Sequence, residues 1–376
     1  MSDFRRRQFL QAIVGSAGIA LPNFRAQNVQ PAPGSSPESP TGSLTDVSGI
    51  KVGHFTDPRR PTGCTAILFE HEMSVGVDYD GSAPGDHLGV MLQPVSPIEK
   101  VHGMLLAGAG PFGLPAVQGV TRYLEEQKQG FDWGIRNLRI PIVVGAVIDD
   151  LSVGDGHIRP GEAAGYAACQ AASNASIAEG NVGVGAGATV GKMLKSQGFG
   201  GMKGGVGCAG RRFGEVILSA LVVTNAVGDI RDWRTGKILA GARRQDGRGF
   251  IDIVATLEGN LSKRGARAAL SVNDGALRST TLAVVATNLD FDKVQLTKIA
   301  MMASTGAARA INPYHTTGDG DSTFAISSNS LKTEIPLSVV GALAAELVAE
   351  AAARSVKMAT SIEDWPAYRD YTAQFQ

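Results

Sequence analysis

The stretch Ser279-Thr280-Thr281-Leu282-Ala283-Val284-Val285-Ala286-Thr287 places two threonines at the head of a run of apolar residues. A run of this length without charge is typical of a strand that is covered on both of its faces. Before it lies a polar segment rich in Gly and Arg, Ser262 to Ser279, which predicts an exposed loop. The sequence therefore predicts a hydroxyl pair where a loop meets a buried strand.

The same type of strand is expected at two other apolar runs, Pro141–Ile148 and Val216–Val223. Ala-rich segments with helical spacing occupy Glu162–Ala175, Asp292–Ala310 and Leu337–Lys357. Because fully buried strands alternate with helices along the chain, we expect an α/β fold in stacked layers, with sheets inside and helices outside.

Composition limits the function classes that fit. The 376 residues are 43% hydrophobic and 19% charged, which is enough to bury a large core. The net charge is zero, so electrostatics give no reason to expect nucleic acid or an anionic membrane as a partner. The 48 glycines indicate many tight turns and close backbone approaches. Cys64, Cys169 and Cys208 are too few and too scattered for a disulfide framework or a zinc site, and buried free thiols are expected.

The N-terminal region has the pattern of an export signal. Arg5-Arg6-Arg7-Gln8-Phe9-Leu10-Gln11 is a twin-arginine motif, and Ala12–Leu21 is a short, weakly hydrophobic run. That run is too short to remain as a permanent membrane anchor. We therefore expect a twin-arginine signal peptide at residues 1–27, a disordered Pro/Ser/Gly linker at 28–43 and one domain at 44–376, located in the periplasm.

Two carboxylates lie two residues apart in Gly318-Asp319-Gly320-Asp321-Ser322-Thr323. If a strand begins at Asp321, its period of two points Asp319 and Asp321 in the same direction, and they repel unless a cation lies between them. A hydroxyl at a junction between loop and strand, with a carboxylate pair available, suggests a chain that cuts itself. Cleavage before Thr280 would expose an N-terminus that carries both a nucleophile and its own base, the α-amine.

Other motifs fit less well. The glycine run Gly183–Lys192 differs by one residue from a phosphate loop, and Met193 stands where Ser or Thr would bind magnesium. Lys192 is then either a site lysine or a solvated side chain. His71-Glu72 has no second His at Val75, which argues against zinc, and no serine has the G-x-S-x-G surroundings of a hydrolase nucleophile. We therefore expect neither a metal nor an organic cofactor.

Several separated motifs in order resemble one family. They run from about Val47 to the C-terminal region and comprise Gly49-Ile50-Lys51-Val52-Gly53-His54, Thr62-Gly63-Cys64-Thr65, Gly180-Asn181-Val182-Gly183, Lys203-Gly204-Gly205, Val222-Val223-Thr224-Asn225-Ala226-Val227-Gly228, Thr280–Thr287 and Gly318-Asp319-Gly320-Asp321. With them the chain resembles the DmpA-type L-aminopeptidase/D-esterase family of self-processing N-terminal-nucleophile hydrolases. That family includes β-peptidyl aminopeptidases and nylon-oligomer hydrolases.

The resemblance implies an α/β fold of a particular kind, a four-layer αββα sandwich. It also implies cleavage between Ser279 and Thr280, which gives an α chain ending at Ser279 and a β chain of residues 280–376. The expected assembly is a homo-oligomer of such α/β heterodimers.

Carried over residue by residue, the resemblance assigns five catalytic positions. Thr280 is the nucleophile, and Asn225 helps to bind the oxyanion. Asp319 and Asp321 orient the hydroxyl and amine of the nucleophile, and Lys192 matches a site lysine of the nylon-oligomer branch.

Two positions depart from the family pattern. Ser279 stands before the scissile bond, where many threonine-type members have Asn. Asp149 occupies a position at which several relatives carry Tyr. An acid at this position would bind a substrate ammonium, so Asp149 is our candidate substrate-binding residue.

The expected activity is removal of N-terminal residues from small peptides, amides or esters through an acyl-Thr280 intermediate. The α-amine would replace the histidine of a catalytic triad, so no cofactor is required. Three alternatives stay open: an endo-acting amidase for oligomeric amides, an acyltransferase like the ornithine acetyltransferases, and a non-catalytic binding relative.

Overall fold

A computed structural model describes residues 42–264 and 279–372 of the chain. All of these belong to one compact unit, Pro40–Gln376. The expected signal peptide and most of the expected linker lie outside the described residues, as does 265–278 of the expected loop. The start of that loop is helical, because helix α4 (Ile253–Arg264) includes Ser262. The prediction of a loop at this point was wrong.

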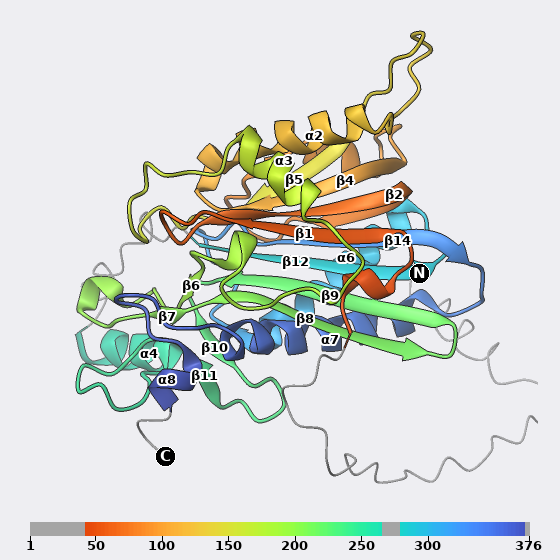
Figure 1. Ribbon diagram of the computed structural model, residues 1–376. Coiled ribbons are helices and arrows are strands. Elements are labelled where there is room, and N and C mark those ends of the chain that lie inside the picture. The colour runs from red at the N-terminus through yellow and green to blue at the C-terminus, as the bar shows by residue number, and fades with distance from the viewer. Residues whose placement is uncertain (1–41, 265–278, 373–376) are drawn as a thin grey trace, which may run out of the picture. The chain divides into compact units, whose positions relative to one another are not determined.

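The main sheet has nine strands in the order β3-β5-β4-β2-β14-β12-β9-β8, with β1 paired to β2 (Figure 1). Its strands are β1 (Ile50–Thr56), β2 (Gly63–Asp78), β3 (Asp86–His87), β4 (Lys100–Ala107), β5 (Val143–Val147), β8 (Gly205–Phe213), β9 (Val216–Asn225), β12 (Thr280–Leu289) and β14 (Ser322–Leu331). A three-stranded sheet joins β11 (Ile238–Ala240), β10 (Asp229–Arg231) and β13 (Ile311–Asn312), and β6 (Thr189–Val190) pairs with β7 (Met202–Lys203).

Apart from α4, the α-helices are α2 (Val117–Glu126), α3 (Glu162–Gln170), α6 (Lys293–Ala310), α7 (Leu337–Lys357) and α8 (Tyr368–Thr372). Short 3-10 turns occupy η1 (Leu44–Asp46), η2 (Gly89–Leu92), η3 (Gly110–Ala116), η4 (Gly183–Gly185) and η5 (Lys195–Gln197). The two long predicted helices are confirmed, and Asp292 caps α6 by accepting the Gln295 N–H. Helix α3 ends at Gln170, five residues earlier than predicted.

Alternation along the strands divides the core into layers. On β4, Leu105 packs with α2 and α3, whereas Met104 faces the inner core. On β12, Val285 faces α6 and α7, whereas Val284 faces the same inner core. Strand β2 pairs with β4 and, through Ser74–Asp78, with β14, so it belongs to both inner layers. Helices therefore cover both outer faces (Figure 1), and the expected four-layer αββα sandwich is confirmed.

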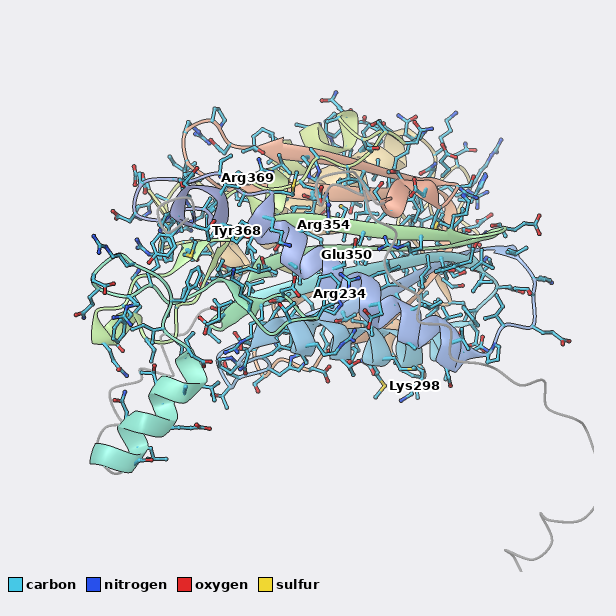
Figure 2. The ribbon with its side chains drawn as sticks, turned by 90° about the horizontal axis from the view of Figure 1, so that it is seen from below. Arg234, Lys298, Glu350, Arg354, Tyr368 and Arg369 are labelled. Atoms are coloured by element: carbon cyan, nitrogen blue, oxygen red, sulfur yellow. The ribbon has the colours of Figure 1, made fainter. Side chains whose placement is uncertain are left out.

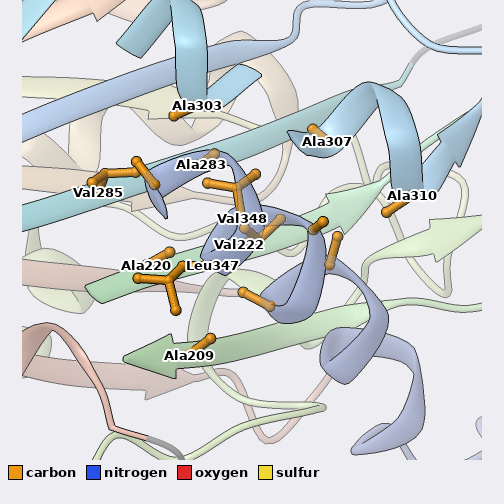
Figure 3. Packing of buried hydrophobic residues seen from close by; sticks show 14 of the residues in the cluster. Ala209, Ala220, Val222, Ala283, Val285, Ala303, Ala307, Ala310, Leu347 and Val348 are labelled. Carbon is orange, nitrogen blue, oxygen red and sulfur yellow. The ribbon is translucent and has the colours of Figure 1, made fainter. Parts of the chain in front are cut away.

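The contact of α6 and α7 with the sheet uses mainly small side chains. Figure 3 shows Ala303, Ala307 and Ala310 of α6 and Leu347 and Val348 of α7 in one buried cluster with Ala220, Val222 and Ala283 of the strands. Small residues allow the helix backbones to come close together. At Gly306 the approach is so close that a Cβ atom would lie 1.9 Å from the Ala345 carbonyl oxygen of α7.

A Gly306→Ala substitution should therefore lower the melting temperature. The helices must separate to accommodate the methyl group, at a cost of about 1–3 kcal/mol. Gly259→Ala is the matched control, because Gly259 also lies within a helix and a Cβ there meets nothing within 4 Å. It should be neutral or stabilise by up to about 1 kcal/mol through helix propensity. Equal melting temperatures for the two variants would contradict this account of the α6–α7 contact.

Two ion pairs fix α7 against the sheet. Figure 2 shows Glu350 and Arg354 on this helix. Glu350 Oε2 lies 2.6 Å from Arg211 Nη2 of β8. Arg354 Nε donates to Glu179 Oε1 at 2.9 Å, and that oxygen also accepts the Cys208 N–H of β8 at 2.8 Å. Both pairs therefore connect α7 to β8, the first directly and the second through Glu179.

Two further features can be compared with the sequence. The three cysteines are buried and unpaired, as predicted. Within the described part of the chain, no helix combines the length and the apolar character that a bilayer crossing requires.

Candidate active site

Sheet topology brings three distant segments to one place. Strand β12 runs antiparallel to β9, so its first residue, Thr280, lies opposite the last residue of β9, Asn225. It runs parallel to β14, so Ser279 forms a bridge with Asp319 in the loop before β14. The head of β12 therefore lies between the end of β9 and the beginning of β14.

The carbonyl group that precedes Thr280 is held by two donors. Thr280 Oγ1 donates to Ser279 O at 2.7 Å, and the Gly320 N–H donates to the same oxygen at 2.9 Å. Thr280 as a whole residue is only 6% exposed. A Cβ at Gly320 would lie 2.8 Å from Thr280 Oγ1 and 2.5 Å from Ala83 O, so the loop can approach Thr280 this closely because residue 320 is glycine. Of these two donors, only the Gly320 N–H can still donate when charge develops on this oxygen, because the Thr280 hydroxyl loses its proton if it attacks the carbonyl carbon.

The predicted carboxylate pair is buried at the same end of β12. Asp321 Oδ1 accepts the Thr281 N–H at 2.6 Å. Asp319 Oδ2 accepts both the N–H and the hydroxyl of Thr316, at 2.9 and 2.7 Å. Burial and the charge of Asp321 raise the pKa of Asp319 to about 6. Asp319 Oδ1 is buried and has no hydrogen-bond partner among the described residues, which is uncommon for a carboxylate outside a functional site.

The amide of Asn225 connects the remaining candidates. Its Oδ1 accepts the Thr189 N–H at 3.0 Å and Lys192 Nζ at 2.9 Å. Its Nδ2 donates to Asp149 O at 2.9 Å. Two donors on one side of the amide and an acceptor on the other define its orientation. The side chain is fully buried, so this network determines where its second N–H points.

Lys192 lies at the site and is not a solvated side chain. Its ammonium contacts both the side chain and the backbone carbonyl of Asn225, the latter at 3.2 Å. Burial lowers the pKa of Lys192 to about 7, although the carboxylates of Asp319 and Asp149 act in the opposite direction. An amine with this pKa exchanges its proton near neutrality, which suits proton transfer.

A second buried lysine supports this network, and the sequence analysis assigned no role to it. Lys203 Nζ donates to the carbonyl oxygens of Gly185, Ala188 and Gly204 at 2.9, 2.9 and 2.8 Å. It is fully buried, and burial lowers its pKa to about 7. These bonds fix the Gly-rich segment that carries Thr189 and Lys192. Lys203 belongs to one of the sequence motifs, but no local pattern shows that it is buried.

A buried ion pair fixes the turn that carries Asp149. Arg60 Nη2 lies 2.6 Å from Asp150 Oδ1, and neither side chain is exposed. Asp150 also accepts the Thr62 hydroxyl at 2.8 Å and the Ala109 N–H at 2.9 Å. Because Asp149 O is the acceptor for Asn225, the ion pair determines indirectly where the amide lies. The sequence analysis missed Arg60 and Asp150, which are 90 residues apart.

The structure thus brings all seven predicted site residues to the head of β12: Ser279, Thr280, Asn225, Asp319, Asp321, Lys192 and Asp149. Sequence reasoning missed Thr189, Thr316 and Gly320, which contact them, and Lys203, which binds the Gly-rich segment that carries Lys192. Within residues 42–264 and 279–372, no three His, Cys, Asp or Glu side chains are arranged to hold a metal ion. The site is therefore built from hydroxyl, amide, amine and carboxylate groups.

Solved structures share this fold. The L-aminopeptidase D-Ala-esterase/amidase of Ochrobactrum anthropi, described as a variant of the Ntn hydrolase fold, superposes with a TM-score of 0.63 at 19% identity, over 89% of this chain and 94% of its own. A β-aminopeptidase of Burkholderia sp. superposes with a TM-score of 0.60 at 18% identity, with the same coverage. The chain therefore shares the fold of these two aminopeptidases, the first of which is described as a variant of the Ntn hydrolase fold.

The profile of Peptidase family S58 matches residues 42–366, and the chain belongs to this family. An uncharacterized aminopeptidase of Mycobacterium leprae is 35% identical over 88% of this chain and 94% of its own length. A 6-aminohexanoate-oligomer endohydrolase of Kocuria sp. is 28% identical over 83% of this chain and 85% of its own. The resemblance seen in the sequence is confirmed, and the protein is an enzyme of the peptide- and amide-hydrolase class. A non-catalytic binding relative is not supported.

Proposed function

We propose that the protein is a self-processing N-terminal-threonine hydrolase that releases N-terminal residues from small peptides, amides or esters. The observation that carries the proposal is the contact between Thr280 Oγ1 and Ser279 O. The Thr280 hydroxyl lies beside the Ser279–Thr280 peptide bond, and this bond is what keeps the nitrogen of Thr280 from being a free amine. The hydroxyl is therefore suited to cut it. The Gly320 N–H on the same oxygen supports this, because it would stabilise the charge that develops there.

In self-cleavage, Thr280 Oγ attacks the carbonyl carbon of Ser279 and loses its proton to a nearby base. Lys192 and Asp319, with pKa values of about 7 and about 6, are suited to accept it. Breakdown of the tetrahedral intermediate protonates the nitrogen of Thr280 and leaves an ester between Ser279 and Thr280 Oγ. Water hydrolyses the ester, which frees the hydroxyl and the α-amine of Thr280.

In turnover, the free α-amine takes the proton from Thr280 Oγ as the oxygen attacks the substrate carbonyl. The pKa of an α-amine at a chain terminus is ordinarily about 7.7–8.0, which suits a general base near neutral pH. We assign the second N–H of Asn225 Nδ2 to the oxyanion, and the charge of Asp321, fixed at Thr281 N, to the orientation of the new ammonium. Water then hydrolyses acyl-Thr280 with the same amine as base.

Purified protein should contain a fragment that begins at Thr280 and ends at Gln376. Intact-mass spectrometry and N-terminal sequencing of the smaller band on a denaturing gel would measure this directly. A preparation that turns over substrate while its chain stays whole would exclude the proposal, and so would a first residue other than Thr280.

The second candidate, endo-acting cleavage of oligomeric amides, is favoured by the name of the Kocuria relative. Asp149 favours the aminopeptidase instead, because its carboxylate lies near enough to affect the charge of Lys192 and would bind a substrate ammonium. For aminoacyl p-nitroanilides, an Asp149→Asn variant should raise KM about tenfold or more, the usual effect of losing a charged hydrogen bond. An N-acylated oligoamide serves as the control. If the variant and the wild type have the same KM for the aminoacyl p-nitroanilide, as well as for the N-acylated oligoamide, the endo-acting enzyme is favoured.

Two further parts of the proposal rest on the sequence alone. The twin-arginine motif supports export of the folded protein to the periplasm, and family resemblance supports an assembly of α/β heterodimers.

A further inference from the structure

One histidine behind the candidate site has no role in the mechanism above. His315 lies between two acidic groups from different segments. Its Nδ1 is 3.2 Å from Asp321 Oδ2, and its Nε2 is 3.3 Å from Asp80 Oδ2, just beyond β2. Its backbone N–H also donates to Asp321 Oδ2, at 3.2 Å. His315 therefore contacts the carboxylate that binds Thr281 N, next to the nucleophile.

The hydrogen bonds around Nε2 specify which atoms carry protons. Ser304 Oγ of α6 donates its only proton to Asp80 Oδ2 at 2.7 Å. Towards His315 Nε2, 3.0 Å away, Ser304 Oγ can therefore only accept a hydrogen bond. Nε2 is then protonated. Nδ1 faces a carboxylate oxygen, which has only lone pairs to offer, so a favourable contact there also needs an N–H. Its geometry is that of an ion pair without a well-aligned hydrogen bond.

The imidazole of His315 is surrounded by negative charge and by the face of an aromatic ring. Burial and a hydrogen bond with Asp80 raise the pKa of Asp78 to about 7, so near neutral pH this pair keeps a proton and the negative charge lies on Asp80. The Tyr314 ring lies 3.7 Å from the His315 ring, centroid to centroid, and the face of an aromatic ring stabilises a cation.

We propose that His315 is a positioning residue: held between Asp80 and Asp321, it keeps the Asp321 carboxylate directed at the head of β12. The inference rests on the proposed function, since it deepens the role of Asp321 in that mechanism. His315 acts through Asp321 and does not touch the substrate.

The charged and titratable groups near His315 come from four segments. They are Asp78 and Asp80 at the end of β2, Lys298 on α6, Tyr314 beside His315 itself, and Asp319 and Asp321 before β14. Lys298 acts on Asp78 and carries a positive charge. The acids outnumber the cations, so a variant that lacks the imidazole leaves negative charge beside Asp321 with fewer N–H donors facing it. The charge of Asp321 already raises the pKa of Asp319, and this change should raise it further.

Two variants separate the two contacts of His315. The amide of His315→Asn reaches the position of Nδ1, and that of His315→Gln reaches the position of Nε2, but neither carries charge. Asn also tolerates the left-handed backbone at this position, where φ is 54°. His71→Gln, at an exposed site on β2, is the control for the same change of residue type.

For both variants we expect the rate of self-cleavage, and kcat of the cut enzyme, to fall about tenfold to a hundredfold, the range for the loss of one partner from a close contact with a charged group. KM should change less than about twofold, because the substrate does not touch His315. The acidic limb of the kcat profile should move to higher pH. Ser304→Ala, which removes only the hydroxyl between Asp80 and His315, should shift the limb in the same direction by less.

The measurements are the fraction of cut chain over time, then kcat, KM and the pH profile of the cut form, each with the melting temperature. If both His315 variants lose thermal stability alone and keep the wild-type pH profile, His315 is only structural and the inference is wrong. If a His315 variant does not fold, the Ser304→Ala variant decides instead. An acidic limb of its kcat profile at the wild-type pH would also show that the inference is wrong. A wild-type chain that is active but uncut would instead overturn the proposed function, so the two failures are distinguishable.

Discussion

A Thr280→Val variant should remain one uncut chain and lose at least about a thousandfold in kcat/KM, as expected when the nucleophile of a covalent mechanism is removed. Valine has nearly the shape of threonine, so the buried head of β12 should keep its packing. The missing hydroxyl abolishes attack on the Ser279 carbonyl, and without cleavage no α-amine is released. One change therefore removes both the nucleophile and the base.

The matched control is the same substitution one residue later. Thr281 is buried like Thr280, but its hydroxyl has no hydrogen-bond partner among the described residues, and its contact with Asp321 uses only the backbone N–H. Thr281→Val should therefore be cut normally and keep its activity. A denaturing gel and kcat/KM measurements on both variants would check this. Cleavage in Thr280→Val, or equal loss of activity in both, would argue for a different nucleophile.

An Asn225→Ala variant should be the next most damaged, with kcat reduced about 100- to 1,000-fold, the usual effect of losing one oxyanion donor. It also leaves the Thr189 N–H and the Lys192 ammonium without the acceptor that Asn225 Oδ1 supplies. KM should change much less, because the donor acts mainly in the transition state. Steady-state kinetics on the cut form would separate the two parameters.

A second buried asparagine at the other end of β12 serves as the control. Asn288 accepts the Ile217 N–H at 2.9 Å and donates to Glu215 O at 2.8 Å, so it connects two segments just as Asn225 connects β6 with the turn that carries Asp149. Asn288→Ala should lower the melting temperature to a similar extent yet retain kcat. If kcat of Asn225→Ala lies within about threefold of this control, Asn225 has only a structural role.

Local sequence patterns were sufficient for the layers of the fold. Helices α6 and α7 were predicted closely because Ala-rich spacing, with the Asp292 cap in α6, acts within a few residues. The strands were predicted because apolar runs bounded by polar turns are strong signals. The loop prediction failed at Ser262, where polar residues extend a helix on the surface, since polarity alone does not distinguish an exposed helix from a loop.

The candidate site was only partly accessible to sequence reasoning. Thr280, Asp319 and Asp321 attracted attention through residue type and spacing, whereas Asn225 and Lys192 needed family resemblance. Lys203, Arg60 and His315 were missed, because each depends on burial or on partners from distant parts of the chain. A buried lysine and an exposed one have the same local sequence.

By itself, the sequence determined which segments become strands and helices, and it placed a hydroxyl and a carboxylate pair at strand ends. Side-chain periodicity and propensity are local properties, so they can be read from neighbouring residues. Only the tertiary structure decided that the end of β9 and the beginnings of β12 and β14 meet, because strand order and direction depend on packing of the whole sheet. Burial at that meeting point then set the pKa values of Lys192 and Asp319, since desolvation depends on every surrounding layer.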